Sequence, residues 1–217
     1  MESSKIIVNG EETRIASAMD ETMDFAGKAG LSAKESLRLR LMTEELLGLL
    51  AGITDNEYMA QFWVEEKGGK CILHLSGETR MTSERRAELL ESATDRKNAA
   101  AVGIMGKIRD MIDVSLLSLN DVGWSGAITA DQPVSAFCSA GMETSAYAMD
   151  MYVWTLRNYR ENMMNREGEP LEFEEDVYTP WDELERSLIA NLADDVRVSV
   201  RSDKVDIEVT KDFGFEK

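Results

Sequence analysis

Residues 194–213 read DDVRVSVRSDKVDIEVTKDF, and this stretch decides the fold. Valine or isoleucine occupies every second position on either side of a polar turn. These positions are Val196, Val198, Val200, Val205, Ile207 and Val209. Because neighbouring side chains of a strand point to opposite faces, the alternation predicts two antiparallel strands with one buried face. Other parts of the chain must therefore cover that face.

Upstream segments supply a second hairpin and the helices to cover the sheet. Residues 58–65 and 70–75 are rich in aromatic and β-branched residues around Gly68-Gly69, which predicts a hairpin. Residues 5–8 form a short apolar strand. Apolar residues three or four apart predict a helix over residues 13–28. A second helix, to about residue 53, begins at the capping box of Ser32 and Glu35.

The order of these elements predicts an α+β fold, a two-layer sandwich of helices on an antiparallel sheet. We expect one domain over residues 1–217, with further helices over residues 83–98, around Ile108 and over residues 181–191. A mainly helical segment, residues 117–181, is inserted before the last hairpin and carries a long helical pattern over residues 142–165. Its many Met, Tyr and Trp residues favour core packing or an adaptable contact surface.

The charge of the chain excludes several classes of partner. The net charge is -17, which argues against nucleic acids and anionic membrane surfaces. Residues 79–110 differ, with seven basic and five acidic residues. This stretch either contacts phosphate or forms solvated helices of mixed charge.

Two features suggest a cytoplasmic location. The N-terminus lacks the basic and apolar regions of a signal peptide. Cys71 and Cys138 form neither a disulfide framework nor a metal-binding pattern, which suits a reducing compartment. We therefore expect a cytoplasmic protein.

The inventory of catalytic groups is short. His74 is the only histidine and lies in the middle of a predicted strand, so a Ser-His-Asp triad has no free base. The chain contains no GxxxxGK[ST] loop and no GxGxxG turn. Zinc enzymes and dinucleotide enzymes are thereby disfavoured.

Residues 41–50, LMTEELLGLL, place two acids and a glycine inside an otherwise apolar helix. A helical glycine costs roughly 1 kcal/mol relative to alanine, and a carboxylate is rarely buried without a partner. Glu44 is either a solvated acid on a half-exposed helix or part of a former active site.

Three segments in this order resemble the GHKL (histidine-kinase-like) ATPase superfamily, and most closely its small anti-sigma-factor serine/threonine kinases. LMTEELLGLLAGI (41–53) resembles the first motif, in which a glutamate precedes an asparagine by four residues. CILHLSGET (71–79) lies where the family has a strand that ends in Asp-x-Gly-x-Gly. GIMGKIRDMID (103–113) resembles a glycine-rich turn into a helix. The resemblance covers residues 1–116 and 182–213.

The resemblance implies a cytoplasmic regulator that binds ATP and Mg²⁺, with a sigma factor or an anti-sigma antagonist as protein partner. Glu44 would be the catalytic base of a protein kinase or ATPase. The implied nucleotide-binding residues are Gly48, Ser76, Gly77, Thr79, Gly103, Gly106, Lys107 and Arg109.

This chain departs from the family at positions that matter for the chemistry. Gly48 stands where the asparagine would bind Mg²⁺, Ser76 replaces the aspartate, and Thr79 replaces a glycine. A register shifted by one residue would place Glu45 and Leu49 at the first motif, which is no better for Mg²⁺. The alternative is a catalytically degenerate module that binds a protein partner, or dimerises, through the inserted segment.

Overall fold

The computed structural model describes residues 1–9, 11–49, 59–78, 106, 108, 112, 115, 142–143, 151–165, 187–201 and 204–214. Seven strands in these residues form one sheet in the order β1-β2-β3-β7-β6-β5-β4, and every neighbouring pair is antiparallel. The strands are β1 (Ile6–Val8), β2 (Ala60–Lys67), β3 (Lys70–Glu78), β4 (Met142–Glu143), β5 (Met151–Thr155), β6 (Asp195–Arg201) and β7 (Lys204–Asp212).

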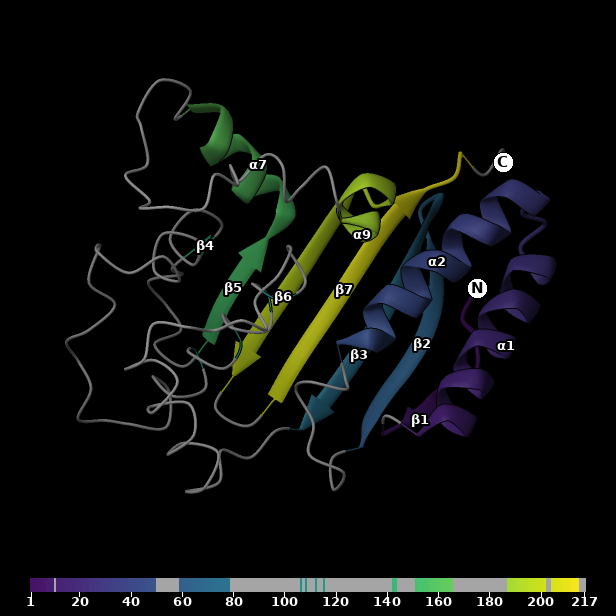
Figure 1. Cartoon of the computed structure of the whole chain (residues 1–217). Coiled ribbons are helices and arrows are strands. Elements are labelled where there is room, and N and C mark those ends of the chain that lie inside the picture. Colours follow the sequence, from purple (N-terminus) through teal and green to yellow (C-terminus); the bar gives the residue numbers. More distant parts are fainter. Residues whose placement is uncertain are drawn as a thin grey trace.

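Helices pack on one face of this sheet (Figure 1). They are α1 (Glu12–Lys28), α2 (Ala33–Gly48) and the short α9 (Leu188–Leu192), while α7 (Leu156–Asn165) follows β5 directly. The α+β class predicted from the sequence is confirmed, and so are both hairpins, α1 and the start of α2. No helix among the described residues is long and apolar enough to cross a membrane.

The core lies between the helices and the inner face of the sheet. The alternating residues of the last hairpin are all buried, as are the apolar residues of β2 and β3 that lie beside them. The inner-face residues of β2 and β3 are Ala60, Phe62, Val64, Cys71, Leu73 and Leu75. Burying one such aliphatic or aromatic side chain contributes about 1.5–3 kcal/mol, so this face dominates the stability of the fold.

The capping box predicted at the start of α2 is present. The Ser32 hydroxyl accepts a hydrogen bond from the Glu35 N–H, and the Glu35 carboxylate accepts one from the Ser32 N–H at 2.8 Å. The Ser32 hydroxyl also donates to the Glu35 carboxylate at 2.6 Å. This hydrogen bond, together with the one from the Ser32 N–H, holds the pKa of Glu35 below its usual value. The helix ends at Gly48, with Leu49 as its C-cap, and is thus shorter than the predicted span to residue 53; residues 50–58 lie outside the described part.

The inserted segment departs from the predicted helix over residues 142–165. Of its described residues, those of α7 are helical, whereas residues 142–143 and 151–155 are strands. Tyr152, Val153 and Trp154 are aromatic or β-branched residues that favour strands, and the edge of β6 provides their pairing partner. The segment therefore extends the sheet.

Other expected helices fall largely outside the described residues. The helix over residues 83–98 lies outside them entirely. Around Ile108, residues 106, 108, 112 and 115 are helical, and Ile108 and Ile112 are buried. Of the helix over residues 181–191, the described part is α9, which begins at the N-cap Ser187.

Candidate functional site

Glu44 and Gly48 lie together on the outer side of α2. They are four residues apart on one helix face, and both are exposed. The buried Met42 and Leu46 occupy the opposite side, which packs on the core. A Cβ atom added to Gly48 would meet nothing within 4 Å. The structure thus brings two predicted site residues together, on a face that is open to solvent.

Because the space around Gly48 is open, we predict that a small side chain there stabilises the fold. Gly48→Ala should raise the free energy of unfolding by up to about 1 kcal/mol, because alanine is the better helix former and meets no neighbour. Gly30→Ala is a control of opposite sign, since the φ of Gly30 is +72° and an alanine there is strained. Both values follow from urea unfolding. Destabilisation by Gly48→Ala would show that the space is needed for packing.

Glu45, the neighbouring acid, is the one that the fold partly buries. The Ser187 hydroxyl of the α9 N-cap donates a hydrogen bond to Glu45 Oε1 at 3.2 Å. The other carboxylate oxygen, Oε2, is buried and has no hydrogen-bond partner among the described residues. Burial raises the pKa of Glu45, and this effect outweighs the hydrogen bonds from the Ile189 N–H and from Ser187. Of the two adjacent acids, Glu45, the one at the shifted register of the first motif, is therefore the one that contacts another helix, α9.

Ser76 and Gly77 are neighbours in β3, so the Ser76 side chain and a Cβ added to Gly77 would lie on opposite faces of the sheet. Ser76 follows the inward-facing Leu75, so its side chain is on the outer face. There its hydroxyl donates to Asp206 Oδ1 of β7 at 2.7 Å, and Lys204 binds the same carboxylate at 2.9 Å. A Cβ on Gly77 would lie 3.3 Å from that of Ala60. The structure does not bring the Ser76 side chain to the helix layer that carries Glu44.

The remaining predicted site residues cannot be placed in the same way. Thr79, Gly103, Lys107 and Arg109 lie outside the described residues. Gly106 is helical and half-buried. Their assignment to a phosphate site stays a prediction.

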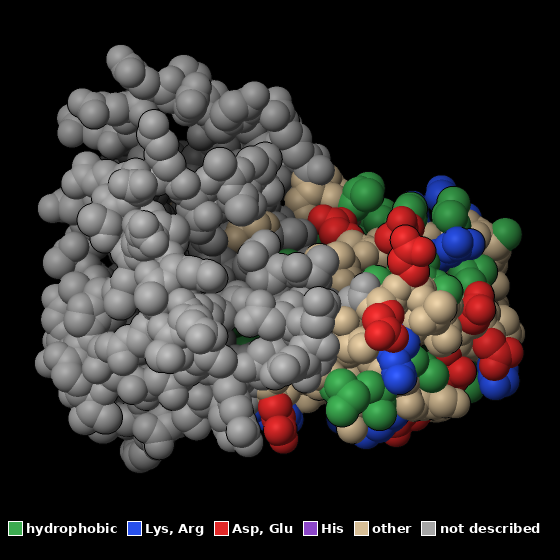
Figure 2. Space-filling model, turned by 60° about the horizontal axis from the view of Figure 1, so that its bottom comes forward, with side chains coloured by type: hydrophobic (Ala, Val, Ile, Leu, Met, Phe, Trp, Pro, Cys, Tyr) green, Lys and Arg blue, Asp and Glu red, His purple; other side chains and the backbone are tan. Residues whose placement is uncertain are grey.

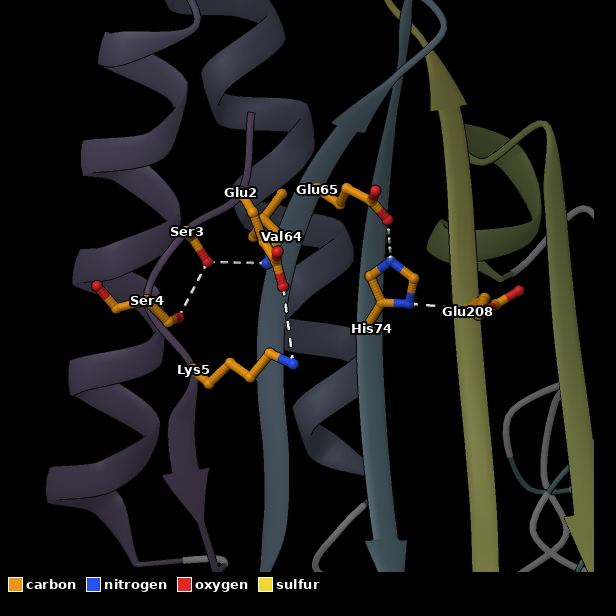
Figure 3. Close-up of polar contacts among 8 residues, drawn as sticks. All are labelled: Glu2, Ser3, Ser4, Lys5, Val64, Glu65, His74 and Glu208. Atoms are coloured by element: carbon orange, nitrogen blue, oxygen red, sulfur yellow. Dashed lines mark hydrogen bonds and ion pairs between the residues drawn. The ribbon is translucent and has the colours of Figure 1, made fainter.

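The outer face of the sheet carries a polar cluster around the single histidine (Figure 3). The His74 ring stacks on Trp63, with ring centroids 4.6 Å apart and an interplanar angle of 6°. Nε2 lies 3.2 Å from Glu65 Oε2, and Nδ1 lies 3.7 Å from Glu208 Oε1. Both ring nitrogens thus face carboxylates from neighbouring strands. This placement fits a structural role for the histidine.

A change of register between the N-terminal segment and β2 places a cation over the same cluster. Ile6 pairs with Phe62, whereas the Ser3 N–H donates to the Val64 carbonyl at 2.8 Å. Two residues, Ser4 and Lys5, therefore oppose the single Trp63, as in a β-bulge. Lys5 Nζ lies 4.5 Å from the centroid of the Trp63 ring, a cation–π distance.

This cluster was not predicted as a unit, because its members come from distant parts of the chain. Glu208 is far from His74 in sequence and reaches it only through the pairing of β3 with β7. Among the described residues, no group of three His, Cys, Asp or Glu could hold a metal ion. The contacts are those of a structural network.

Comparisons with known proteins add no assignment. No protein-family model matches this chain, and no curated protein matches it. The resemblance to GHKL ATPases rests on the sequence motifs alone.

Proposed function

We propose that this chain is a non-catalytic signalling or scaffold module, which keeps a sandwich of the histidine-kinase-like ATPase type and binds a protein partner. The observation that carries the proposal is the placement of Ser76. Its side chain is on the outer face of the sheet and is bound to Asp206, away from α2. A nucleotide beside Glu44 would therefore lack the hydrogen bond that the family's second motif supplies.

The metal chemistry of the first motif gives the proposal a second support. Phosphoryl transfer relies on Mg²⁺ to offset the charge of the triphosphate. Gly48 has no side chain to bind the ion, and Leu49, four residues after Glu45, is apolar and buried. Neither register of α2 offers the oxygen ligand that Mg²⁺ prefers.

The helix layer offers apolar side chains to a partner. Leu37 of α2 is 55% exposed and Leu188 of α9 is 51% exposed. Figure 2 shows one side of the molecule, where apolar side chains of the described elements are interspersed with acidic and basic ones. By the resemblance, the partner is a sigma factor or an anti-sigma antagonist, and a homodimer is a special case.

Isothermal titration of the full chain with ADP and ATP, with and without Mg²⁺, tests the proposal. We expect binding that is absent or no tighter than millimolar, because two of the three motifs lack their polar ligands. Low-micromolar binding that depends on Mg²⁺ would overturn the proposal. Light scattering on the same sample separates a homodimer from a monomer that awaits another protein.

A second candidate function is ATP-dependent kinase or ATPase activity, favoured by the shared exposed face of Glu44 and Gly48. In that case Glu44→Ala should leave nucleotide affinity nearly unchanged and abolish turnover. Equal loss of binding and turnover would show that Glu44 is not the base. Glu45→Gln is the matched comparison, because it removes the adjacent carboxylate from the same helix.

A further inference from the structure

The contact between α2 and α9 is built around Glu45 and Ser187. The Ser187 hydroxyl donates to Glu45 Oε1 at 3.2 Å and accepts from the Ala190 N–H at 3.3 Å. The Ile189 N–H also donates to the carboxyl group of Glu45. One side chain of α2 therefore meets two donors at the first turn of α9.

The second oxygen of the same carboxyl group has no such support. Glu45 Oε2 is buried and makes no hydrogen bond with the part of the chain that the structure describes. An ionised carboxylate needs donors at both oxygens or contact with water, and a buried oxygen without either costs free energy. A neutral carboxylic acid avoids most of this cost. The site therefore favours the neutral form of Glu45 over the ionised form.

The described groups that face Glu45 are uncharged. From α9 they are the Ser187 hydroxyl and the Ile189 N–H, and no charged side chain among the described residues contributes to the shift in the pKa of Glu45. Between α1 and α2, the Thr22 hydroxyl lies 3.4 Å from that of Thr43. On the inner face of β3, Cys71 interacts with Glu35 at the other end of α2, and burial raises the pKa of its thiol to about 12.

Charged groups lie nearby but are turned elsewhere. On α2 itself, the Glu44 side chain is exposed to solvent. The Arg160 guanidinium of α7 donates to the carbonyl groups of Ala190 and Asp194, at the other end of α9. Arg160 thus holds the C-terminal end of α9 while Glu45 holds its beginning.

We propose that Glu45 makes the packing of α9 on α2 proton-dependent, so that the neutral acid closes the contact and ionisation loosens it. Because the carboxyl group binds its proton more tightly in the closed state, the contact is strongest below the ordinary pKa of glutamate, 4.5. It weakens as the pH rises from there through the higher pKa of the closed state. The proposal concerns a conformational device and does not depend on the proposed function.

Amide hydrogen exchange of the full chain over a series of pH values tests this device. The reporters are the N–H groups of Ala190, Asn191 and Ala193, which are hydrogen-bonded within α9. After correction for the intrinsic exchange rate, their opening constant should rise with pH by up to about tenfold per pH unit within the window between the two pKa values. Glu45→Gln should abolish this rise, because glutamine is neutral at every pH.

Glu44→Gln is the matched control, since Glu44 is adjacent in sequence and exposed. It should keep the pH dependence of the wild type. An equal slope in the wild type and in Glu45→Gln would overturn the proposal. Should Glu45→Gln fail to fold, the titration of both carboxyl carbons by NMR in the wild type decides the matter: a midpoint for Glu45 no higher than that for Glu44 would contradict the proposal.

Discussion

Replacing Trp154 by alanine is expected to lower the free energy of unfolding by about 3–5 kcal/mol, although the residue lies in the inserted segment. Its side chain is 0% exposed and lies in the same core cluster as the inner-face residues of the sheet. It sits opposite Val198 in the pairing of β5 with β6, and its ring centroid lies 5.9 Å from that of Tyr159. Truncation would leave a large cavity between β5 and α7.

Urea unfolding followed by circular dichroism measures this loss. Met164→Ala is the control from the same segment, since Met164 of α7 is 58% exposed and its truncation should change the stability by no more than about 0.5 kcal/mol. Similar small effects of both substitutions would mean that β5 and α7 are an appendage. The expected result instead makes the inserted segment part of the core.

The periodic patterns in the sequence predicted most of the described fold. The alternation of apolar residues from Val196 to Val209 was enough to predict the last hairpin, because a strand with one buried face must pack against other elements. The capping box of Ser32 and Glu35 fixed the start of α2 for an equally local reason. Elements whose structure is decided within a few residues could thus be predicted.

The failed prediction, a helix over residues 142–165, has a non-local cause. The strand β5 (Met151–Thr155) forms because the edge of β6 is available, and β6 lies about forty residues further along the chain. Local spacing cannot show which edge of a sheet will be free. Aromatic and β-branched residues in this stretch were the one signal that favoured a strand.

The site residues show two different limits. Glu44 and Glu45 are neighbours, and one residue turns a helix by about 100°, so the motif alone could not decide which acid is exposed. The outward direction of Ser76, in contrast, follows from the inward positions of Cys71, Leu73 and Leu75 two residues apart. Strand alternation could have placed this side chain on the outer face, and a motif comparison that ignores alternation could not.

Leu46→Ala is expected to cost about 2–5 kcal/mol, because it removes a side chain that is 0% exposed from the buried face of α2. Leu37→Ala, on the same helix, removes the same atoms from a side chain that is 55% exposed and should change the stability by about 0.5 kcal/mol or less. Comparing the two variants isolates the effect of burial on stability, since helix propensity changes equally in both.

The ratio of the two losses also tests the orientation of α2, on which the interpretation of Glu44 depends. Leu37 and Glu44 are seven residues apart and therefore share the outer side of the helix, whereas Leu46 faces the core. Urea unfolding of both variants measures the losses. A greater loss for Leu37→Ala than for Leu46→Ala would mean that α2 is rotated, which would turn Glu44 inward and away from solvent. With the orientation described, the acid that faces α9 is Glu45, and Glu44 remains free to meet a partner.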